Sequence, residues 1–321
     1  MSPPGTVDDD PTTGRHRWPF RGEHRRGRTA FVLAGGGSRG AGQVGMLAEL
    51  TDRGIRPDRV YGASVGAVNA AAYCGDPTPN GVARMEDIWR SVTGEHVFPS
   101  GRVHGPWKFF QQRPAVHPNS GLRRIVEEGL LFERLEESPI PLEVVATSLV
   151  DGRERWFSEG PAADAILASA AIPSILPPVT LGDDVLVDGG VVDNVPISRP
   201  IAQGLTRIYV LLCGPLHFRP PMPRRPVENL VTAFFIGIHA RFAREVGDLP
   251  PGVEVVVFSG GPPPADYRDF SETPKMIEEG RAEVAAVLDG QRASAHQPGA
   301  DEPGWGDVGA PGARAYGETP H

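Results

Sequence analysis

Two short apolar runs, each followed by a glycine-containing turn and a helical pattern, constrain the fold of this chain more than any other feature. The run TAFVLA at 29–34 leads into GGGSRG, and the shorter run Val60-Tyr61 leads into GASVG and a run of small residues. A continuous apolar run such as TAFVLA is typical of a strand buried on both faces. Strands that alternate with helices form a parallel sheet covered by helices, so we expect an α/β fold.

The pentapeptide Gly62-Ala63-Ser64-Val65-Gly66 has the G-x-S-x-G spacing of a nucleophile elbow. In an elbow the serine sits on a sharp strand-to-helix turn, and the flanking glycines let the two backbones approach closely. Ser64 would then lie at a helix N-terminus, where free N–H groups favour developing negative charge. The same residues also arise by chance in an alanine-rich protein, so the neighbouring motifs decide between the two interpretations.

The glycine loop at 35–40 is open to a nucleotide-binding interpretation. Gly35, Gly37 and Gly40 match the G-x-G-x-x-G spacing of a dinucleotide site between a strand and a helix. Asp58 lies at about the distance expected of a ribose-binding acid. Asp58 precedes the second predicted strand, however, whereas a ribose-binding acid is expected where that strand ends.

The same loop also suits acyl transfer. Loops that follow parallel strands emerge at one edge of the sheet, so the glycine loop should face Ser64. Backbone N–H groups of Gly36, Gly37 and Val65 would then converge on the oxyanion of a tetrahedral intermediate.

A serine nucleophile needs a base that accepts its proton. None of the histidines after the elbow lies in a clear glycine turn at a strand end. Asp188 ends a hydrophobic strand and precedes Gly189-Gly190, so its carboxylate would lie at the same edge as Ser64. An Asp-Gly turn at a strand end is the plain structural alternative. Asp183 and Asp193 are weaker candidates, because no strand directly precedes them.

Four motifs in this order resemble the patatin-like phospholipase family: GGGSRG at 35–40, GASVG at 62–66, ASAAIPSILPP at 168–178 and VDGGVVDNVP at 187–196. The resemblance spans about 29 to 288 and includes DFSETPKMIEEG at 269–280. It implies a three-layer α/β/α sandwich with a mainly parallel central sheet. It also implies a serine acyl hydrolase that cleaves ester bonds of phospholipids, lysophospholipids or related lipids.

The resemblance further implies a role for individual residues. Ser64 would be the nucleophile and Asp188 the general base of a dyad without histidine. The implied oxyanion hole comprises Gly35, Gly36, Gly37, Ser38, Arg39, Gly40 and Val65. The glycines implied to support the two turns are Gly62, Gly66, Gly189 and Gly190. We therefore expect neither a metal nor another cofactor.

Two other functions stay open on the sequence alone. An α/β-hydrolase esterase with a Ser-His-Asp triad would need a base histidine, and its elbow usually follows several strands, whereas Ser64 follows only the second. A non-catalytic, Rossmann-like nucleotide-binding module would rest on the glycines at 35–45.

Composition sets the expected domain boundaries. Residues 1–28 and 291–321 are rich in proline, glycine and charge, so we expect two disordered tails around a catalytic domain at 29–290. Within that domain the pattern loosens over 80–119. Aromatic and basic residues at 97–113 suit a lid over an apolar site, a membrane contact or a plain insertion.

The net charge of −8 and the absence of a nucleic-acid motif argue against a nucleic-acid partner. Cys74 and Cys213 lie far apart in apolar contexts and imply neither a disulfide framework nor a zinc site. Without a secretion signal or a transmembrane run, we expect a cytoplasmic protein whose substrate class suggests peripheral membrane contact. The sequence specifies neither a lipid head group nor an oligomeric state.

Overall fold

The computed structural model describes residues 28–99, 115–215, 229, 236–237, 241–261 and 269–290. Within these residues eight strands form one mixed sheet. Five parallel strands follow the spatial order β3 (Leu142–Ser148), β2 (Arg59–Ala63), β1 (Thr29–Leu33), β7 (Arg207–Leu211) and β8 (Glu254–Phe258). Three strands pair antiparallel to their neighbours: β4 (Glu154–Phe157), β5 (Val179–Leu181) and β6 (Asp184–Asp188).

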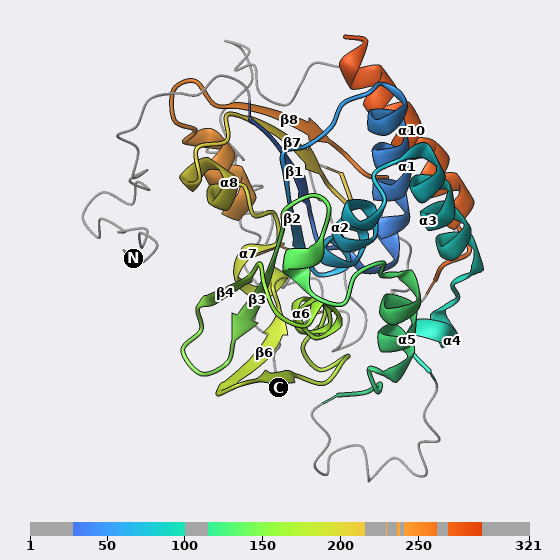
Figure 1. Cartoon of the computed structure of the whole chain (residues 1–321), viewed down its shortest axis with the longest axis vertical. Coiled ribbons are helices and arrows are strands. Elements are labelled where there is room, and N and C mark those ends of the chain that lie inside the picture. Colours follow the sequence, from blue (N-terminus) through green and yellow to red (C-terminus); the bar gives the residue numbers. More distant parts are fainter. Residues whose placement is uncertain are drawn as a thin grey trace, which may run out of the picture.

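Helices cover both faces of the sheet (Figure 1). One side carries α1 (Gly40–Asp52), α2 (Val65–Gly75), α3 (Pro79–Ser91) and α10 (Thr273–Leu288), and the other carries α8 (Ser198–Ala202). The shorter helical elements are η1 (Gly37–Arg39), α4 (Gly94–Val97), α5 (Ser120–Gly129), η3 (Leu135–Glu137), α6 (Ala162–Ser169) and α7 (Gly190–Asp193).

The side chains of β1 alternate between the two helical layers. Phe31 and Leu33 belong to the larger core together with residues of α1 and α2. Ala30 and Val32 pack on the other face with Ile201 of α8. The strand is therefore buried on both faces, as its continuous apolar run predicts. The predicted three-layer α/β/α sandwich with a mainly parallel sheet is confirmed.

Two strands reach the same edge of β3 from opposite directions. Val144 pairs with both β2 and β4, so these two strands lie on opposite edges of β3. Ala146 pairs with both β4 and β6, so β6 lies on the edge of β3 opposite to β4. Strands β2 and β6 therefore share one edge. The last residue of β2, Ala63, lies opposite Val145, and the last residue of β6, Asp188, lies opposite Ala146. The ends of β2 and β6 thus meet at adjacent residues of β3.

Helices α1 and α10 pack very closely because glycines face each other. An ideal Cβ at Gly45 would lie 1.9 Å from the carbonyl oxygen of Ile277, and one at Gly280 would lie 2.1 Å from that of Gly42. Real Cβ atoms do not approach a carbonyl this closely, so neither position accepts a side chain. Gly45, one of the glycines at 35–45, therefore serves helix packing.

Several sequence predictions fall partly outside the described residues. These are both tails apart from Arg28, and residues 100–114 of the loosely patterned segment. The first part of the loosely patterned segment at 80–119 forms most of α3, which packs against α1 and α2. Cys74 and Cys213 are both buried. Among the described helices, none has the length and apolar character needed to span a membrane.

Candidate active site

Ser64 occupies a strained turn between β2 and α2. Its φ of 55° and ψ of −128° fall where residues other than glycine are rare. Helix α2 begins at the next residue, and the Ser64 N–H donates to Ser169 Oγ at 2.9 Å. Ser169 is fully buried, so its hydroxyl holds the turn from beneath. This backbone geometry is that of a nucleophile elbow.

Neighbouring atoms occupy the space of a side chain at all four supporting glycines. A backbone carbonyl oxygen lies 2.1 Å from the ideal Cβ position at Gly66 and 2.2 Å from that at Gly189. Gly62 and Gly190 are similarly crowded, with the nearest atoms at 2.6 Å and 2.5 Å. The absence of side chains at these positions therefore lets the turns after β2 and β6 pack closely against neighbouring parts of the chain.

The side chains of Ser64 and Asp188 are in direct contact, although they are 124 residues apart in the chain. Ser64 Oγ donates to Asp188 Oδ2 at 2.6 Å. Asp188 Oδ1 accepts from the N–H of Gly190 at 2.7 Å, and Thr147 Oγ1 donates to the Asp188 carbonyl at 2.9 Å. The contact follows from the sheet, because the ends of β2 and β6 meet on one edge of β3.

The Asp188 carboxyl is removed from water and is a stronger base than an ordinary aspartate. It is 1% exposed, and Ser64 is 5% exposed. Burial raises the pKa of Asp188 from the ordinary 3.8 to about 7, and the hydrogen bonds from Ser64 and Gly190 lower it only in part. A base whose pKa lies near the working pH accepts a proton readily and is still substantially ionised there.

The glycine loop lies directly against the serine. An ideal Cβ at Gly35 would lie 2.8 Å from Ser64 Cβ, and Gly37 begins η1 with a φ of 62° that favours glycine. In the part of the chain that the structure describes, the N–H groups of Gly36, Gly37 and Val65 form no hydrogen bond. Free backbone donors beside a nucleophile are the elements of an oxyanion hole.

Three consecutive carbonyl groups of this loop are each held by a side-chain donor. The bonds run from Gln43 Nε2 to Ala34 O (2.8 Å), from Asn194 Nδ2 to Gly35 O (3.2 Å) and from Arg39 Nε to Gly36 O (3.2 Å). Because the peptide group is planar and trans, a fixed carbonyl also fixes the direction of the following N–H. The donors of the loop are therefore oriented before any substrate binds.

Ser38, Arg39 and Gly40 lie in different surroundings. Ser38 lines the cavity described below, whereas Arg39 is not among its lining residues. The Arg39 guanidinium is buried beside Gly214 and the Gly36 carbonyl, and burial lowers its pKa. Gly40 starts α1, where a Cβ would lie 2.5 Å from a methyl group of Val65. Arg39 thus supports the loop through its bond to the Gly36 carbonyl and does not line the cavity.

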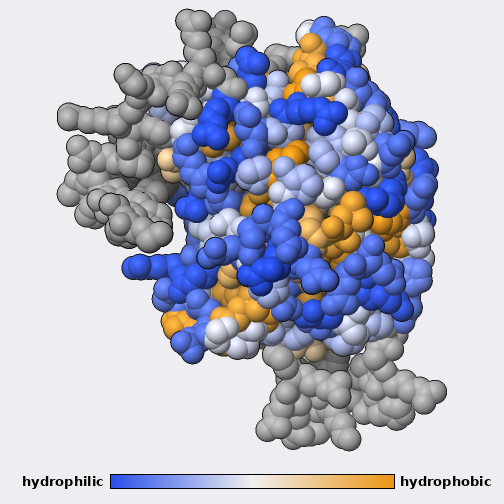
Figure 2. All heavy atoms as spheres, in the orientation of Figure 1, coloured by the Kyte–Doolittle hydropathy of each residue, from blue (hydrophilic) through white to orange (hydrophobic). Residues whose placement is uncertain are grey.

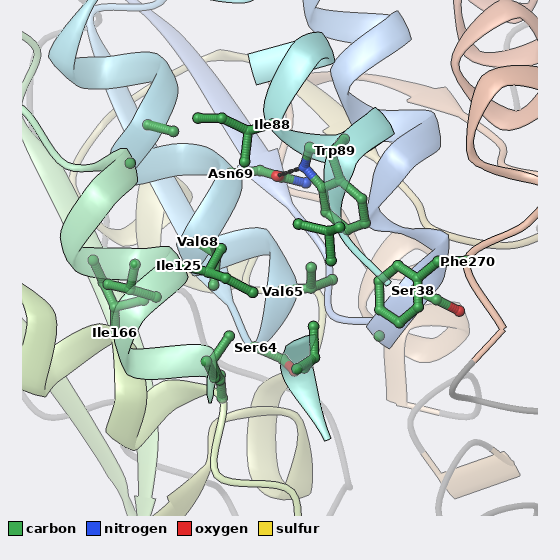
Figure 3. Close-up of a pocket in the computed structure, with 18 of the residues that line it drawn as sticks. Ser38, Ser64, Val65, Val68, Asn69, Ile88, Trp89, Ile125, Ile166 and Phe270 are labelled. Carbon is green, nitrogen blue, oxygen red and sulfur yellow. Dashed lines mark hydrogen bonds between the residues drawn. The ribbon is translucent and has the colours of Figure 1, made fainter. Parts of the chain in front are cut away.

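Ser64 opens onto a cavity of about 100 Å³ between α2, α3, α5 and α6. In Figure 3, Ile125 and Ile166 flank one side of this space, and Trp89 and Phe270 flank the other. The Trp89 ring stacks on Phe270 at 6.2 Å between centroids, and its indole N–H donates to Asn69 Oδ1 at 2.9 Å. No charged side chain of the described residues lines the cavity. The space therefore suits an apolar group.

Four buried supporting side chains were not singled out from the sequence: Gln43, Thr147, Ser169 and Asn194. Ser169 and Asn194 belong to motifs that carry the family resemblance, so the sequence offered a signal for both residues, but it did not indicate their contacts. Gln43 and Thr147 carry no such signal, because their partners are backbone carbonyl groups brought close only by the fold.

The residues of the nucleotide-binding interpretation lie apart from one another. Asp58 Oδ2 accepts from the N–H of Thr29 at 2.7 Å, at the start of β1. The glycine loop follows the opposite end of that strand. Asp58 is therefore not placed to bind a ribose whose phosphates would occupy the loop.

The other candidate bases are also displaced from the serine. The two histidines that the structure describes, His96 and His117, do not line the cavity. Asp193 is buried but forms an ion pair with Arg241 at 3.2 Å, and Asp183 is exposed. Among these candidates, Asp188 alone contacts Ser64.

Comparison with known proteins gives a family. The sequence model of the patatin-like phospholipase family matches residues 31–201, which is just over half of the chain and extends from within β1 into α8. The chain belongs to the patatin-like phospholipase family. Both Ser64 and Asp188 lie within the matched residues of this patatin-like protein.

The curated relatives are proteins of the NTE group. Lysophospholipase NTE1 of Yarrowia lipolytica is 30% identical over 196 residues, which cover 60% of this chain and 13% of the relative. An uncharacterised NTE family protein of Mycobacterium tuberculosis is 29% identical over 229 residues, covering 69% of this chain and 58% of the relative. The patatin-like chain thus spans less than two thirds of the length of either relative.

Among solved structures, VipD from Legionella pneumophila matches with a TM-score of 0.45 and 15% sequence identity. The match covers 82% of this chain and 67% of VipD.

Proposed function

We propose that this patatin-like protein is a serine acyl hydrolase that cleaves carboxylic ester bonds of phospholipids, lysophospholipids or related lipids. The observation that carries the proposal is the 2.6 Å hydrogen bond from Ser64 Oγ to Asp188 Oδ2 beside an apolar cavity. Relatives named lysophospholipase support a lipid ester as the substrate.

In the first half of the reaction, Ser64 Oγ attacks the ester carbonyl carbon as its proton passes to Asp188 Oδ2. The carbonyl oxygen becomes an oxyanion and accepts hydrogen bonds from the N–H groups of Gly36, Gly37 and Val65. The intermediate collapses when the carbon–oxygen bond to the leaving alcohol breaks. Asp188 returns the proton to that alcohol, which leaves an acyl group on Ser64.

In the second half, a water molecule takes the place of the alcohol. Asp188 accepts a proton from the water, and the hydroxide oxygen attacks the acyl carbon on Ser64. Collapse of the second intermediate releases the carboxylic acid, and the proton returns from Asp188 to Ser64 Oγ. The same carboxylate therefore serves as base and acid in turn, without histidine.

The cavity determines which part of the substrate enters. Its walls are apolar and Ser64 lies on its surface, so we place the acyl chain of the substrate inside it. The described lining offers no cation to pair with a phosphate. The phosphate of a phospholipid would therefore remain outside, and neutral esters should also be cleaved.

We further propose that the protein, as a cytoplasmic hydrolase, contacts a lipid surface peripherally. The face in Figure 2 is mainly hydrophilic, with several apolar residues exposed among polar ones. Leu131 is 54% exposed and follows Leu130, which lines the cavity. An exposed apolar side chain thus lies one residue from the cavity wall. Replacement of Leu131 by Glu should weaken cosedimentation with phosphatidylcholine vesicles while hydrolysis of a soluble ester is retained.

The catalytic proposal is tested with a p-nitrophenyl ester and a fluorophosphonate probe. Wild type should hydrolyse the ester and be labelled at Ser64, whereas Ser64→Ala should do neither and Asp188→Asn should lose hydrolysis. Ser91→Ala, which changes an exposed serine at the end of α3, is the matched control and should behave as wild type. Turnover by the Ser64 or Asp188 variant at the wild-type rate would refute the dyad.

A further inference from the structure

Asn194 joins the two loops that carry the proposed dyad and oxyanion hole. It caps the C-terminus of α7, six residues after Asp188, and is 8% exposed. Its side-chain amide donates from Nδ2 to Gly35 O at 3.2 Å, and its backbone carbonyl accepts from the Gly35 N–H at 3.2 Å. Asn194 therefore forms hydrogen bonds with both the C=O and the N–H of Gly35.

The Asn194 amide is inserted between two glycines. An ideal Cβ at Gly35 would lie 2.2 Å from Asn194 Oδ1, and one at Gly190 would lie 2.5 Å from the same atom. Gly190 is the residue whose N–H donates to Asp188 Oδ1. The side chain thus contacts the loop of the base and the loop of the oxyanion hole at once, and both glycines leave space for it.

The bond to Gly35 O has a directional effect on the next peptide. The C=O of Gly35 and the N–H of Gly36 belong to one planar, trans peptide group and point in opposite directions. A donor that holds the carbonyl therefore aims the Gly36 N–H the opposite way. Gly36 has one of the free N–H groups beside Ser64.

We propose that Asn194 is a positioning residue for catalysis: its side-chain amide aims the Gly36 N–H at the oxyanion. The inference rests on the proposed serine hydrolase function. Asn194 acts through Gly36 and does not touch the reacting atoms. Loss of its amide would let the peptide between Gly35 and Gly36 rotate, and a misplacement of about 1 Å at a reacting centre can cost about 100-fold in rate.

The backbone bond between Gly35 and Asn194 separates this role from simple support of the fold. It remains when the side chain changes, so the loop keeps one anchor to α7. Asn194→Asp keeps the shape of the side chain but removes the donor, and Asn194→Ala removes the donor without adding charge. Both variants should lower kcat by about 10- to 100-fold, since removal of a whole oxyanion donor costs about 100- to 1,000-fold. KM should stay within about twofold.

Binding of two ligands distinguishes positioning from structural damage. Ser64 Oγ adds to the carbonyl carbon of a fatty trifluoromethyl ketone, and the serine proton passes to Asp188. The carbonyl oxygen becomes an alkoxide in the oxyanion hole. A fatty alcohol of equal chain length occupies the cavity without forming an oxyanion. Both variants should bind the ketone more weakly by the factor lost in kcat, and should bind the alcohol with unchanged Kd.

Gln203→Ala is the matched control. It removes partly buried hydrogen bonds to Tyr61 and Glu143, none of which lines the cavity, and should leave the ratio of the two ligand affinities unchanged. Equal weakening of both ligands, or unchanged ketone affinity, in the Asn194 variants would overturn the proposal. Asn194→Ser provides a third variant, and failure of all three to fold would assign Asn194 to stability instead. Absence of wild-type hydrolysis and of Ser64 labelling would refute the proposed function itself.

Discussion

Replacement of Asp188 by Asn should abolish activity and yet stabilise the protein at neutral and alkaline pH. Asn has the shape of the protonated carboxylic acid, so it can accept from the Gly190 N–H with its oxygen and face Ser64 with its amide. Wild type must instead hold a buried negative charge once Asp188 ionises. The variant removes that charge, and the fold should tolerate it because no side-chain volume changes.

The magnitude follows from the pKa of Asp188, which burial raises from 3.8 to about 7. The folded state therefore binds this proton more tightly than the unfolded state. Its stabilising effect is fully present below pH 3.8 and is lost as the pH rises through about 7. At 1.36 kcal/mol per pH unit, the whole loss is about 4 kcal/mol, of which about 3 kcal/mol falls between pH 5 and pH 8.

Urea unfolding of wild type and Asp188→Asn at pH 5 and pH 8 measures this effect. The free energy of unfolding of the variant relative to wild type should increase by about 3 kcal/mol between the two pH values. Other titrating groups contribute equally to both proteins and cancel. A difference that stays constant from pH 5 to pH 8 would show that Asp188 does not titrate in this range. It would also remove our explanation of how an aspartate serves as the base.

Three further results are expected. The logarithm of kcat/KM should rise with pH, with a slope near one, up to about pH 7 and then level off, because Asp188 must be ionised. A flat profile from pH 5 to 8 would contradict this role. Gly45→Ala should lower the free energy of unfolding, measured in urea, by about 1–3 kcal/mol, because the new methyl group clashes with the Ile277 carbonyl. The control Gly129→Ala, whose methyl group meets no atom within 4 Å, should leave the free energy of unfolding nearly unchanged. Val68→Phe should reduce kcat/KM for octanoyl esters far more than for acetyl esters, and equal loss on both would argue against the acyl site.

Local patterns predicted the sheet and the candidate dyad well. The apolar run at 29–34 forms β1, and the strand expected before GASVG is β2. These predictions depend on neighbours in the chain. Asp188 was predicted because a strand end followed by two glycines is also a local pattern, and the resemblance added its pairing with Ser64.

Features that depend on distant contacts could not be predicted in this way. Nothing near Gln43 reveals that its amide will reach the carbonyls of Ala34 and Leu211, since the latter is 168 residues away. The resemblance places Arg39 at the oxyanion hole; its guanidinium donates to the Gly36 carbonyl, and Arg39 is not among the residues that line the cavity. The raised pKa of Asp188 likewise depends on burial by several elements at once.

The meeting of β2 and β6 on one edge of β3 separates the chemistry from the rest of the chain. The distance between Ser64 and Asp188 depends on how two strand ends pair with Val145 and Ala146, and not on the length of the connections between strands. Insertions or deletions in those connections would leave the pair intact, whereas a one-residue slip of β3 would displace it by about 3.3 Å. Helices α3 and α5, which wall the cavity, lie in these connections. The walls of the cavity can therefore diverge between members of the family while the contact between Ser64 and Asp188 stays in place.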